Sequence, residues 1–372
     1  MRIIITGGGT GGHIYPAITI AREFFRQKPD TQILFVGARR GLESELVPKE
    51  GFELITLNLE GIPRRFTWKI FKSLALALKG LGDALKIIKR FQPDLVIGTG
   101  GYVCAPMLTA AILRGIPTAI QEQNAFPGAT NRILGKLAGK VFLAYAEARK
   151  YFPRQKALVY GNPVRSAGFL DTARAVSEQK LKLKPGRTNL LVFGGSQSAR
   201  RINLTVLAIL ERLLAEFPRL QIMIMTGFKE YDSIQAAVDR LPLTGEARTR
   251  LFLTPYFYNM AEAYSVADLV LARAGAISLA EITCFGIPAL LVPYPFATNN
   301  HQLFNARVLE KGGAARVILE ADLTPESLWR ELATLLADQA LRSRMGAASR
   351  ALSKPQAAEM IVKELLNYRS KV

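Results

Sequence analysis

The sequence predicts an α/β protein of two Rossmann-like domains, each built on a parallel sheet, with a ligand-binding cleft between them. Three observations support this fold class. Short apolar runs alternate with helical-period segments, the pattern restarts in the second half of the chain, and glycine-rich turns follow several of the runs. The 372 residues suffice for two domains that each bury a core.

The first half opens with an apolar run that leads directly into glycines. Further runs follow at intervals filled by helix-forming segments, as expected of parallel strands joined by crossover helices. The four runs predicted as strands are Ile3–Ile5, Ile33–Val36, Leu95–Ile97 and Thr118–Ile120.

The second half repeats this organisation. Its predicted strands are Asn189–Phe193, Gln221–Met225, Leu251–Leu253, Leu269–Leu271 and Ala289–Val292. The openings of the two halves, IIITGGGTGGH and LLVFGGSQSAR, share the pattern of strand, glycine turn and helix. Gly161-Asn162-Pro163 interrupts regular structure. We therefore place the domains at 1–162 and 163–372, with a C-terminal helix that can pack back on the first domain.

Composition narrows the class of protein. Apolar residues make up 49% and charged residues 21%, as in globular proteins, and the longest apolar runs fall far short of the roughly 18 residues of a membrane span. The chain opens without the pattern of a signal peptide, and Cys104 and Cys284 lack metal-ligand spacing. We expect a cytoplasmic protein with two buried free thiols.

The charge favours a polyanionic partner. The formal net charge is +19, of which +12 lies in residues 1–162 and +7 in the rest. Between Gly61 and Pro93 eight basic residues face a single acid, Asp83, and four of the basic residues recur every seven positions: Arg65, Lys72, Lys79 and Lys86. A basic amphipathic helix of this kind suits an anionic membrane surface. A surface helix that covers the sheet explains its apolar stripe equally well.

The first glycine turn, Gly7–His13, satisfies the pattern G-x-G-x-x-G and predicts an anion site at a helix N-terminus. The second predicted strand is followed by Arg39-Arg40 and not by the acid that would bind an NAD ribose, so an NADP-dependent dehydrogenase is one alternative. His13, at the mouth of the turn, is a candidate general base, or else a helix-capping or anion-contacting residue.

Four further turns follow predicted strands, more than one dinucleotide needs: Gly98–Tyr102, Gln121–Asn124, Gly194–Gln197 and Arg273–Ala276. Together they fit a nucleotide diphosphate and a second phosphorylated molecule. Glu281, in a helix opened by Ala276, can bridge ribose hydroxyls, or else lies on a solvated helix face. The chain has no D-x-D and no metal-spaced cluster, so we expect no metal site and no cofactor.

Seven motifs occur in order across nearly the whole chain and together resemble the MurG family of bacterial N-acetylglucosaminyltransferases. They are GGTGGH (Gly8–His13), GTGGY (Gly98–Tyr102), EQNAFPG (Glu122–Gly128), GNPVR (Gly161–Arg165), GGSQSAR (Gly194–Arg200), RAGAISLAE (Arg273–Glu281) and NHQLFNA (Asn300–Ala306). Three positions depart from the expected pattern, namely Ser198 in place of glycine, Gln121 in place of histidine and Ala274 in place of serine.

The resemblance implies a GT-B glycosyltransferase. Its reaction would be the inverting transfer of N-acetylglucosamine from UDP-N-acetylglucosamine to the muramyl 4-hydroxyl of lipid I, which makes lipid II for peptidoglycan synthesis. The implied setting is the cytoplasmic face of the cell membrane, as a peripheral protein on an anionic surface. Components of the cell-wall or division machinery are implied as partners.

The resemblance also implies residue roles. The donor would be bound by Thr10, Gly11, Gly12, Asn124, Arg165, Ser196, Phe257, Ala276, Ile277, Ser278, Leu279, Ala280, Glu281 and Gln302. The acceptor pyrophosphate would be bound by Gly8, Gly9, Gly100, Gly101 and Tyr102. His13 is the candidate catalytic base.

Two further functions fit part of the sequence. A nucleic-acid-binding protein would fit the charge, but we expect no nucleic acid because the basic segment is aliphatic and helical, whereas single-strand binding uses aromatic-rich basic grooves. A GT-B transferase with another lipid acceptor has the same motifs and stays open.

Overall fold

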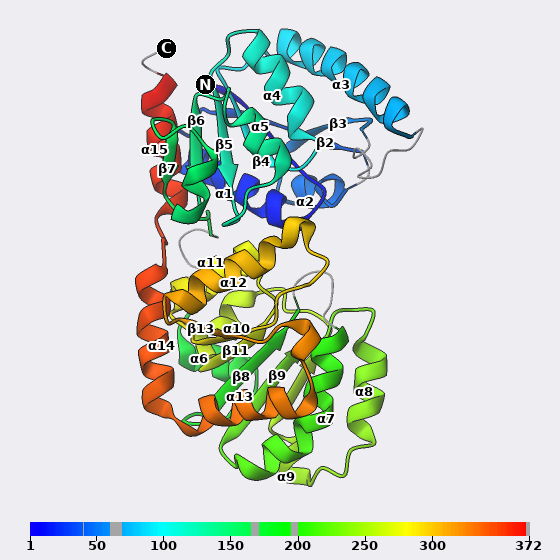
Figure 1. Cartoon of the computed structure of the whole chain (residues 1–372), viewed down its shortest axis with the longest axis vertical. Coiled ribbons are helices and arrows are strands. Elements are labelled where there is room, and N and C mark those ends of the chain that lie inside the picture. The colour runs from blue at the N-terminus through cyan, green and yellow to red at the C-terminus, as the bar shows by residue number, and fades with distance from the viewer. Residues whose placement is uncertain (40, 60–68, 165–170, 195–199, 370–372) are drawn as a thin grey trace. The chain divides into compact units, whose positions relative to one another are not determined.

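The computed structural model describes residues 1–372 except 40, 60–68, 165–170, 195–199 and 370–372. The chain divides into two compact units, Met1–Ser166 with Lys354–Val372, and Ala167–Ser353. The sequence-based division lies at 162, close to the boundary at 166, and the C-terminal segment joins the first unit, in line with the expectation that a C-terminal helix can pack back on the first domain (Figure 1).

A seven-stranded parallel sheet forms the centre of the first unit, in the order β3-β2-β1-β4-β5-β6-β7. Its strands are β1 (Arg2–Gly7), β2 (Gln32–Ala38), β3 (Glu53–Leu57), β4 (Leu95–Gly100), β5 (Thr118–Glu122), β6 (Lys140–Leu143) and β7 (Ala157–Val159). The four predicted strands are confirmed as β1, β2, β4 and β5, while β3, β6 and β7 were not predicted. The strand order reverses at β1, and parallel sheets bind ligands beyond the carboxyl ends of strands at such a point.

Helices cover both faces of this sheet. They are α1 (Gly11–Gln27), α2 (Glu43–Lys49), α3 (Lys69–Phe91), α4 (Cys104–Leu113), α5 (Ala129–Leu134) and α15 (Ala357–Arg369), with a short 3-10 helix, η1 (Ala146–Tyr151). Side chains of a strand alternate between faces, so Ile3 and Ile5 pack with α1 and α15 while Ile4 packs with α3 and α4. Figure 1 shows α15 along this unit, where Lys140 pairs with Glu364 at 2.7 Å.

The predicted basic helix is α3. Its residues Ala84 and Ile88 are buried in the same core cluster as the sheet residues Ile4 and Val36, so the apolar stripe of α3 covers the sheet. Lys79 and Lys86 of the same helix are exposed. Arg65 lies outside the described residues, as does the side chain of Lys72. Within the described ranges, no helix has both the length and the apolar character to span a bilayer.

The second unit is built on a six-stranded parallel sheet in the order β10-β9-β8-β11-β12-β13. Its strands are β8 (Thr188–Phe193), β9 (Leu220–Met225), β10 (Leu251–Thr254), β11 (Leu269–Ala272), β12 (Ala289–Leu291) and β13 (Ala315–Val317). All five predicted strands are confirmed, and β13 was not predicted. The order reverses at β8, so both units have the topology of the predicted Rossmann-like fold class, which is confirmed.

Helices also cover both faces of the second sheet. They are α6 (Arg174–Lys180), α7 (Arg200–Glu216), α8 (Tyr231–Asp239), α9 (Gly245–Arg248), α10 (Met260–Val266), α11 (Ala276–Phe285), α12 (His301–Lys311), α13 (Pro325–Ala337) and α14 (Gln339–Leu352), with 3-10 helices η2 (Thr298–Asn300) and η3 (Glu320–Asp322). Val192 packs with α7 and α13 on one face. Its neighbour Phe193 packs edge-on against Tyr264 of α10, with the ring centroids 6.0 Å apart. Both cysteines are buried thiols, as predicted, and neither belongs to a disulfide.

Candidate functional site

Two glycine turns meet at the switch point of the first sheet. They follow β1 and β4, and the Gly8 N–H donates to the Gly100 carbonyl at 3.3 Å. Gly101 has φ +87°, and a Cβ there would lie 2.6 Å from the Gly8 carbonyl oxygen. Gly100 has φ +113°, and its Cβ would lie 2.7 Å from His13 Nδ1. Only glycine lets these turns approach so closely, so the structure brings Gly8, Gly100, Gly101 and His13 together.

The first turn leads into the N-terminus of α1. Thr10 is the N-cap residue and is exposed, Gly11 is buried and Gly12 is exposed. The first N–H groups of a helix have no helical carbonyl to bond, and together with the helix dipole they attract anions. The phosphate-binding role of this turn stays a prediction.

A buried carboxylate that sequence reasoning missed holds this turn in place. Glu43, at the start of α2, accepts hydrogen bonds from the Gly9 N–H at 3.0 Å and the Ala38 N–H at 2.9 Å. A Cβ at Gly8 would lie 2.2 Å from its Oε1. Glu43 follows β2, as the ribose-binding acid of a dinucleotide fold does, but here its oxygens bind the protein backbone.

His13 is held by two hydrogen-bond acceptors. Its Nδ1 lies 3.0 Å from the Thr99 carbonyl oxygen and 2.9 Å from Gln123 Oε1. The Gln123 amide is oriented by its NH₂, which donates to the Thr99 carbonyl at 2.6 Å and the Gln121 carbonyl at 3.0 Å. Nδ1 therefore donates, and in the neutral ring Nε2 keeps the lone pair that can accept a proton.

A second buried carboxylate, Glu122 at the end of β5, organises the following loop. It accepts from the backbone N–H of Asn124 at 2.9 Å, the Asn124 amide at 3.1 Å, the Gly128 N–H at 3.1 Å and the Asn131 amide at 2.8 Å. Charge-assisted hydrogen bonds of this kind fix a loop strongly. The position of Asn124, a predicted donor ligand, thus depends on Glu122.

In the second unit, the predicted donor residues centre on the N-terminus of α11. Ala276, Ile277 and Ser278 form its first turn, directly beyond the carboxyl end of β11. The next predicted residue, Leu279, is fully buried and its N–H already bonds the Gly275 carbonyl at 3.0 Å, while Ala280 is half-buried.

Gln302 joins two loops beside this helix. Its Oε1 accepts from the Ala274 N–H at 3.1 Å and from the Tyr294 N–H at 3.0 Å. Because the carbonyl end of the side chain is held in this way, the amide NH₂ is the end that can donate to a ligand.

Glu281 and Phe257 are both buried. Glu281 is 6% exposed and accepts from the Tyr264 hydroxyl at 3.2 Å, which excludes the solvated-face alternative. Phe257 is 7% exposed and its ring stacks on Phe252, with centroids 5.8 Å apart, so little of its face is open to a uracil. Its predicted role stays a prediction.

The remaining predicted residues are placed as follows. Tyr102 is half-buried next to Gly101. Arg165 and Ser196 lie outside the described residues. The described part of the chain contains no group of three His, Cys, Asp or Glu side chains that could hold a metal ion. The first-unit residues and the second-unit residues thus form two local groups, each at a strand-order switch point.

Two family descriptions match the chain, one for each half. Residues 3–143 match the glycosyltransferase family 28 N-terminal domain, and residues 189–361 match the glycosyltransferase family 28 C-terminal domain. The two matches together cover most of the chain, and each contains one of the two switch points.

Curated relatives match over nearly the full length. A protein of Thermoanaerobacter sp. (strain X514), named UDP-N-acetylglucosamine--N-acetylmuramyl-(pentapeptide) pyrophosphoryl-undecaprenol N-acetylglucosamine transferase, is 43% identical over 98% of both chains. A protein of the same name from Acetivibrio thermocellus is 40% identical over 100% of both chains. The solved structure of Acinetobacter baumannii MurG superposes with a TM-score of 0.78 at 29% identity, over 98% of this chain and 99% of that one. This chain therefore belongs to glycosyltransferase family 28 and, within it, to the MurG family.

Proposed function

We propose that this chain transfers N-acetylglucosamine from UDP-N-acetylglucosamine to the muramyl 4-hydroxyl of lipid I, with inversion, to make lipid II. The observation that carries this proposal is the similarity to transferases of that name, 43% identity over 98% of the chain. The dehydrogenase and nucleic-acid alternatives do not agree with membership of a glycosyltransferase family.

The donor is assigned mainly to the second unit. The first turn of α11 is suited to bind the diphosphate through backbone N–H groups, and Glu281 to bind the ribose hydroxyls. Its burial supports this role, because a buried carboxylate is a stronger hydrogen-bond acceptor than a hydrated one. Gln302 is assigned to the sugar hydroxyls through its NH₂ group.

The acceptor is assigned to the first unit. The paired glycine turns after β1 and β4 leave room for a pyrophosphate to reach the backbone, because neither turn carries a side chain at Gly8, Gly9, Gly100 or Gly101. Tyr102 borders the second turn. Thr10 to Gly12 and Asn124 are assigned to the donor sugar.

His13 is the proposed general base. In the proposed step the muramyl 4-hydroxyl oxygen bonds to the anomeric carbon, the bond from that carbon to the UDP phosphate oxygen breaks, and the hydroxyl proton passes to His13 Nε2. The charge of the departing UDP is met by backbone N–H groups and by Arg165. Nδ1 is anchored on Thr99 and Gln123, which keeps the ring in the tautomer that this step needs.

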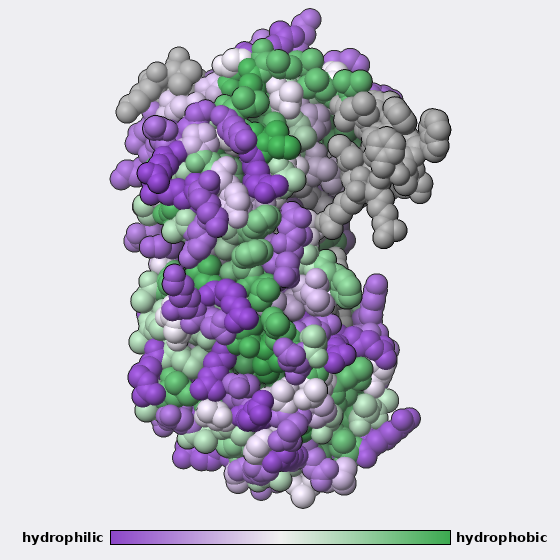
Figure 2. Space-filling model, viewed as in Figure 1, coloured by the Kyte–Doolittle hydropathy of each residue, from purple (hydrophilic) through white to green (hydrophobic). Residues whose placement is uncertain are grey.

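The proposed membrane-docking face lies on the α3–α5 side of the first unit. Four apolar side chains on or beside these helices are each more than 60% exposed: Leu78, Leu113, Ile133 and Leu137. Exposed cations accompany them at Lys79, Arg114 and Lys136. Figure 2 shows a green, hydrophobic area over α4. Apolar side chains ringed by cations suit a bilayer with anionic headgroups, so we propose peripheral binding at the cytoplasmic face.

The test of the proposed function compares acceptors. The protein is incubated with UDP-N-acetylglucosamine and either lipid I or undecaprenyl pyrophosphate that carries N-acetylglucosamine alone, and the products are analysed by mass spectrometry. The proposal expects one added N-acetylhexosamine on lipid I only. Equal or exclusive use of the second lipid would instead favour a transferase with a different lipid acceptor.

A parallel variant tests the base. His13→Asn should lower kcat by about 10²- to 10⁴-fold, the usual contribution of a general base, while donor affinity stays within about threefold. A kcat near that of the parent would assign His13 to capping or anion contact.

A further inference from the structure

An open pocket of about 1000 Å³ lies at the amino-terminal edge of the second sheet. Four strands start at or directly after residues that line it: Thr188, Leu220, Asp268 and Pro288. The proposed donor residues follow the carboxyl end of β11, at the opposite edge of the same sheet. The proposed transfer therefore leaves this pocket unused.

Arginines dominate the lining. Five of them surround the pocket, from the start of α6, from the turns before β8 and β9 and from α14: Arg174, Arg187, Arg219, Arg342 and Arg350. The carboxylates of the lining are Glu216 and Asp268. The formal charge around the pocket is thus clearly positive.

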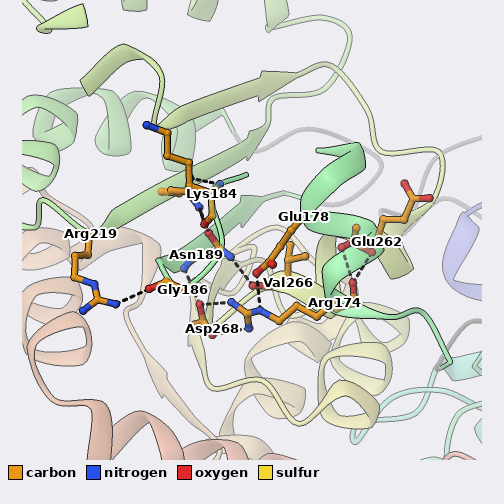
Figure 3. A network of polar contacts seen from close by, with 12 residues as sticks. Arg174, Glu178, Lys184, Gly186, Asn189, Arg219, Glu262, Val266 and Asp268 are labelled. Carbon is orange, nitrogen blue, oxygen red and sulfur yellow. Dashed lines mark hydrogen bonds and ion pairs between the residues drawn. The ribbon is translucent and has the colours of Figure 1, made fainter. Parts of the chain in front are cut away.

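Both carboxylates are already engaged. Arg174 binds Asp268 with two parallel bonds of 2.9 and 3.1 Å and also donates to Glu178 at 2.8 Å (Figure 3). Asp268 further accepts from the Asn189 N–H at 2.8 Å. Glu216 pairs with Arg212 at 2.8 Å. Of the other arginines, Arg187 pairs with Glu246 at 3.7 Å, and Arg342 is attracted electrostatically by Asp268 and Asp338.

Among the described residues, three of the pocket arginines donate hydrogen bonds only to backbone carbonyls. Arg219 donates to Gly186 at 2.6 Å, as Figure 3 shows. Arg342 donates to the carbonyls of Leu335 and Leu336 at 2.6 and 2.7 Å, at the end of α13. Arg350 donates to those of Cys284 and Phe285 at 3.0 and 2.6 Å, at the end of α11. A carbonyl satisfies an N–H but does not neutralise a charge, and each guanidinium has five N–H groups.

A further arginine, Arg250, lies behind the lining of the pocket. Arg250 is buried and donates to the carbonyls of Leu214, Phe217 and Leu220, the last two of which belong to lining residues. Burial lowers the pKa of Arg250 and of Arg342. Of these two residues Arg342 lines the pocket, so an anion bound there would stabilise its poorly solvated charge.

We propose that this pocket is a second ligand site, separate from the donor site, for a small molecule that carries two or more phosphate groups. Planar guanidinium groups bind phosphate oxygens two at a time, and five arginines line this pocket. The volume falls in the range of small-molecule sites, about 300–1,000 Å³. Phe217 and Pro218 add an apolar wall that can contact the rest of the ligand.

The test uses the full chain with the donor site saturated by UDP and inorganic tripolyphosphate as the probe. Calorimetry at fixed ionic strength should give one bound tripolyphosphate per chain. The variant Arg219→Gln/Arg350→Gln should bind it at least about tenfold more weakly, as expected when two charge-assisted contacts are lost. A control with the same change of charge, Arg240→Gln/Arg330→Gln, alters exposed arginines outside the pocket and should bind within about twofold of the parent.

A second measurement on the parent does not depend on how the variants fold. Bound tripolyphosphate should protect Arg219 and Arg350 from phenylglyoxal, as read by peptide mass spectrometry, and leave Arg240 reactive. Absence of binding in the presence of UDP, an equal loss in the control, or unprotected pocket arginines would each overturn the proposal. Binding of a poly-glutamate peptide without binding of tripolyphosphate would also overturn it, in favour of an acidic protein segment.

Discussion

Replacement of Glu281 by alanine should weaken UDP-N-acetylglucosamine binding by about 1.5–3 kcal/mol, the scale of a lost charge-assisted hydrogen bond. This corresponds to a Kd raised about 10- to 150-fold. The carboxylate is 6% exposed and accepts from the Tyr264 hydroxyl at 3.2 Å. Loss of the Glu281 carboxylate removes the acceptor of the Tyr264 hydroxyl, which should also lower the free energy of unfolding by about 1–3 kcal/mol.

Tyr264→Phe is the matched control. It removes the same hydroxyl–carboxylate hydrogen bond but keeps the Glu281 carboxylate, so donor affinity should stay within about threefold of the parent. Calorimetric titration with the donor gives affinity, and thermal unfolding gives stability. If Glu281→Ala binds the donor like the parent, or if Tyr264→Phe weakens binding as much, Glu281 has a structural role only and the assignment to ribose is refuted.

Three further predictions concern metal, membrane and thiol. Donor binding should be unchanged in EDTA, because the chain lacks D-x-D, and a strict requirement for Mg²⁺ in the same titration would contradict this. Replacement of all four basic stripe residues (Arg65, Lys72, Lys79 and Lys86) by glutamine should abolish most co-sedimentation with vesicles of about 30% anionic lipid, since each cation contributes about 1 kcal/mol to membrane binding. Turnover of a short-chain acceptor should hardly change. If the variant sediments like the parent at low salt, the stripe is an ordinary solvated face. Burial raises the pKa of Cys104 from 9.0 to about 12, so the folded state favours the protonated thiol. The stability that this preference gives the folded state is lost as the pH rises from about 9 towards 12. Ellman's reagent at pH 8 should label Cys104 only after denaturation, and rapid labelling of the native protein would contradict its burial.

The sequence predicts the central strands better than the outer ones. Both faces of a central parallel strand are buried, so β1 and β8 appear as continuous apolar runs. The four strands that were not predicted are β3, β6, β7 and β13, and three of these lie at sheet edges. They are three to five residues long. Polar or charged residues interrupt β3 (ELITL) and β13 (ARV), whereas β6 (KVFL) and β7 (ALV) contain apolar runs of only three residues, which the sequence-based prediction did not select.

Part of the candidate site can likewise be predicted from the sequence, and part is seen only in the structure. Glycine turns after apolar runs are visible in a sequence, and the structure explains two of them through the close approach at Gly100 and Gly101. Glu43 and Glu122 were not predicted as supports of these turns, because an isolated acid in a polar stretch resembles a solvated one. Only the fold shows that two backbone N–H groups converge on each carboxylate.

Transfer of radiolabel from UDP-N-acetylglucosamine to lipid I is the direct test of the proposed glycosyltransferase activity. The full chain is incubated with labelled donor and lipid I in EDTA, and the label is counted in the butanol phase. Butanol-soluble label should appear only when lipid I is present, and it should be reduced about 10²- to 10⁴-fold in His13→Asn. Label that stays in the aqueous phase as UDP-sugar or free sugar, with active lipid I present, would contradict that activity.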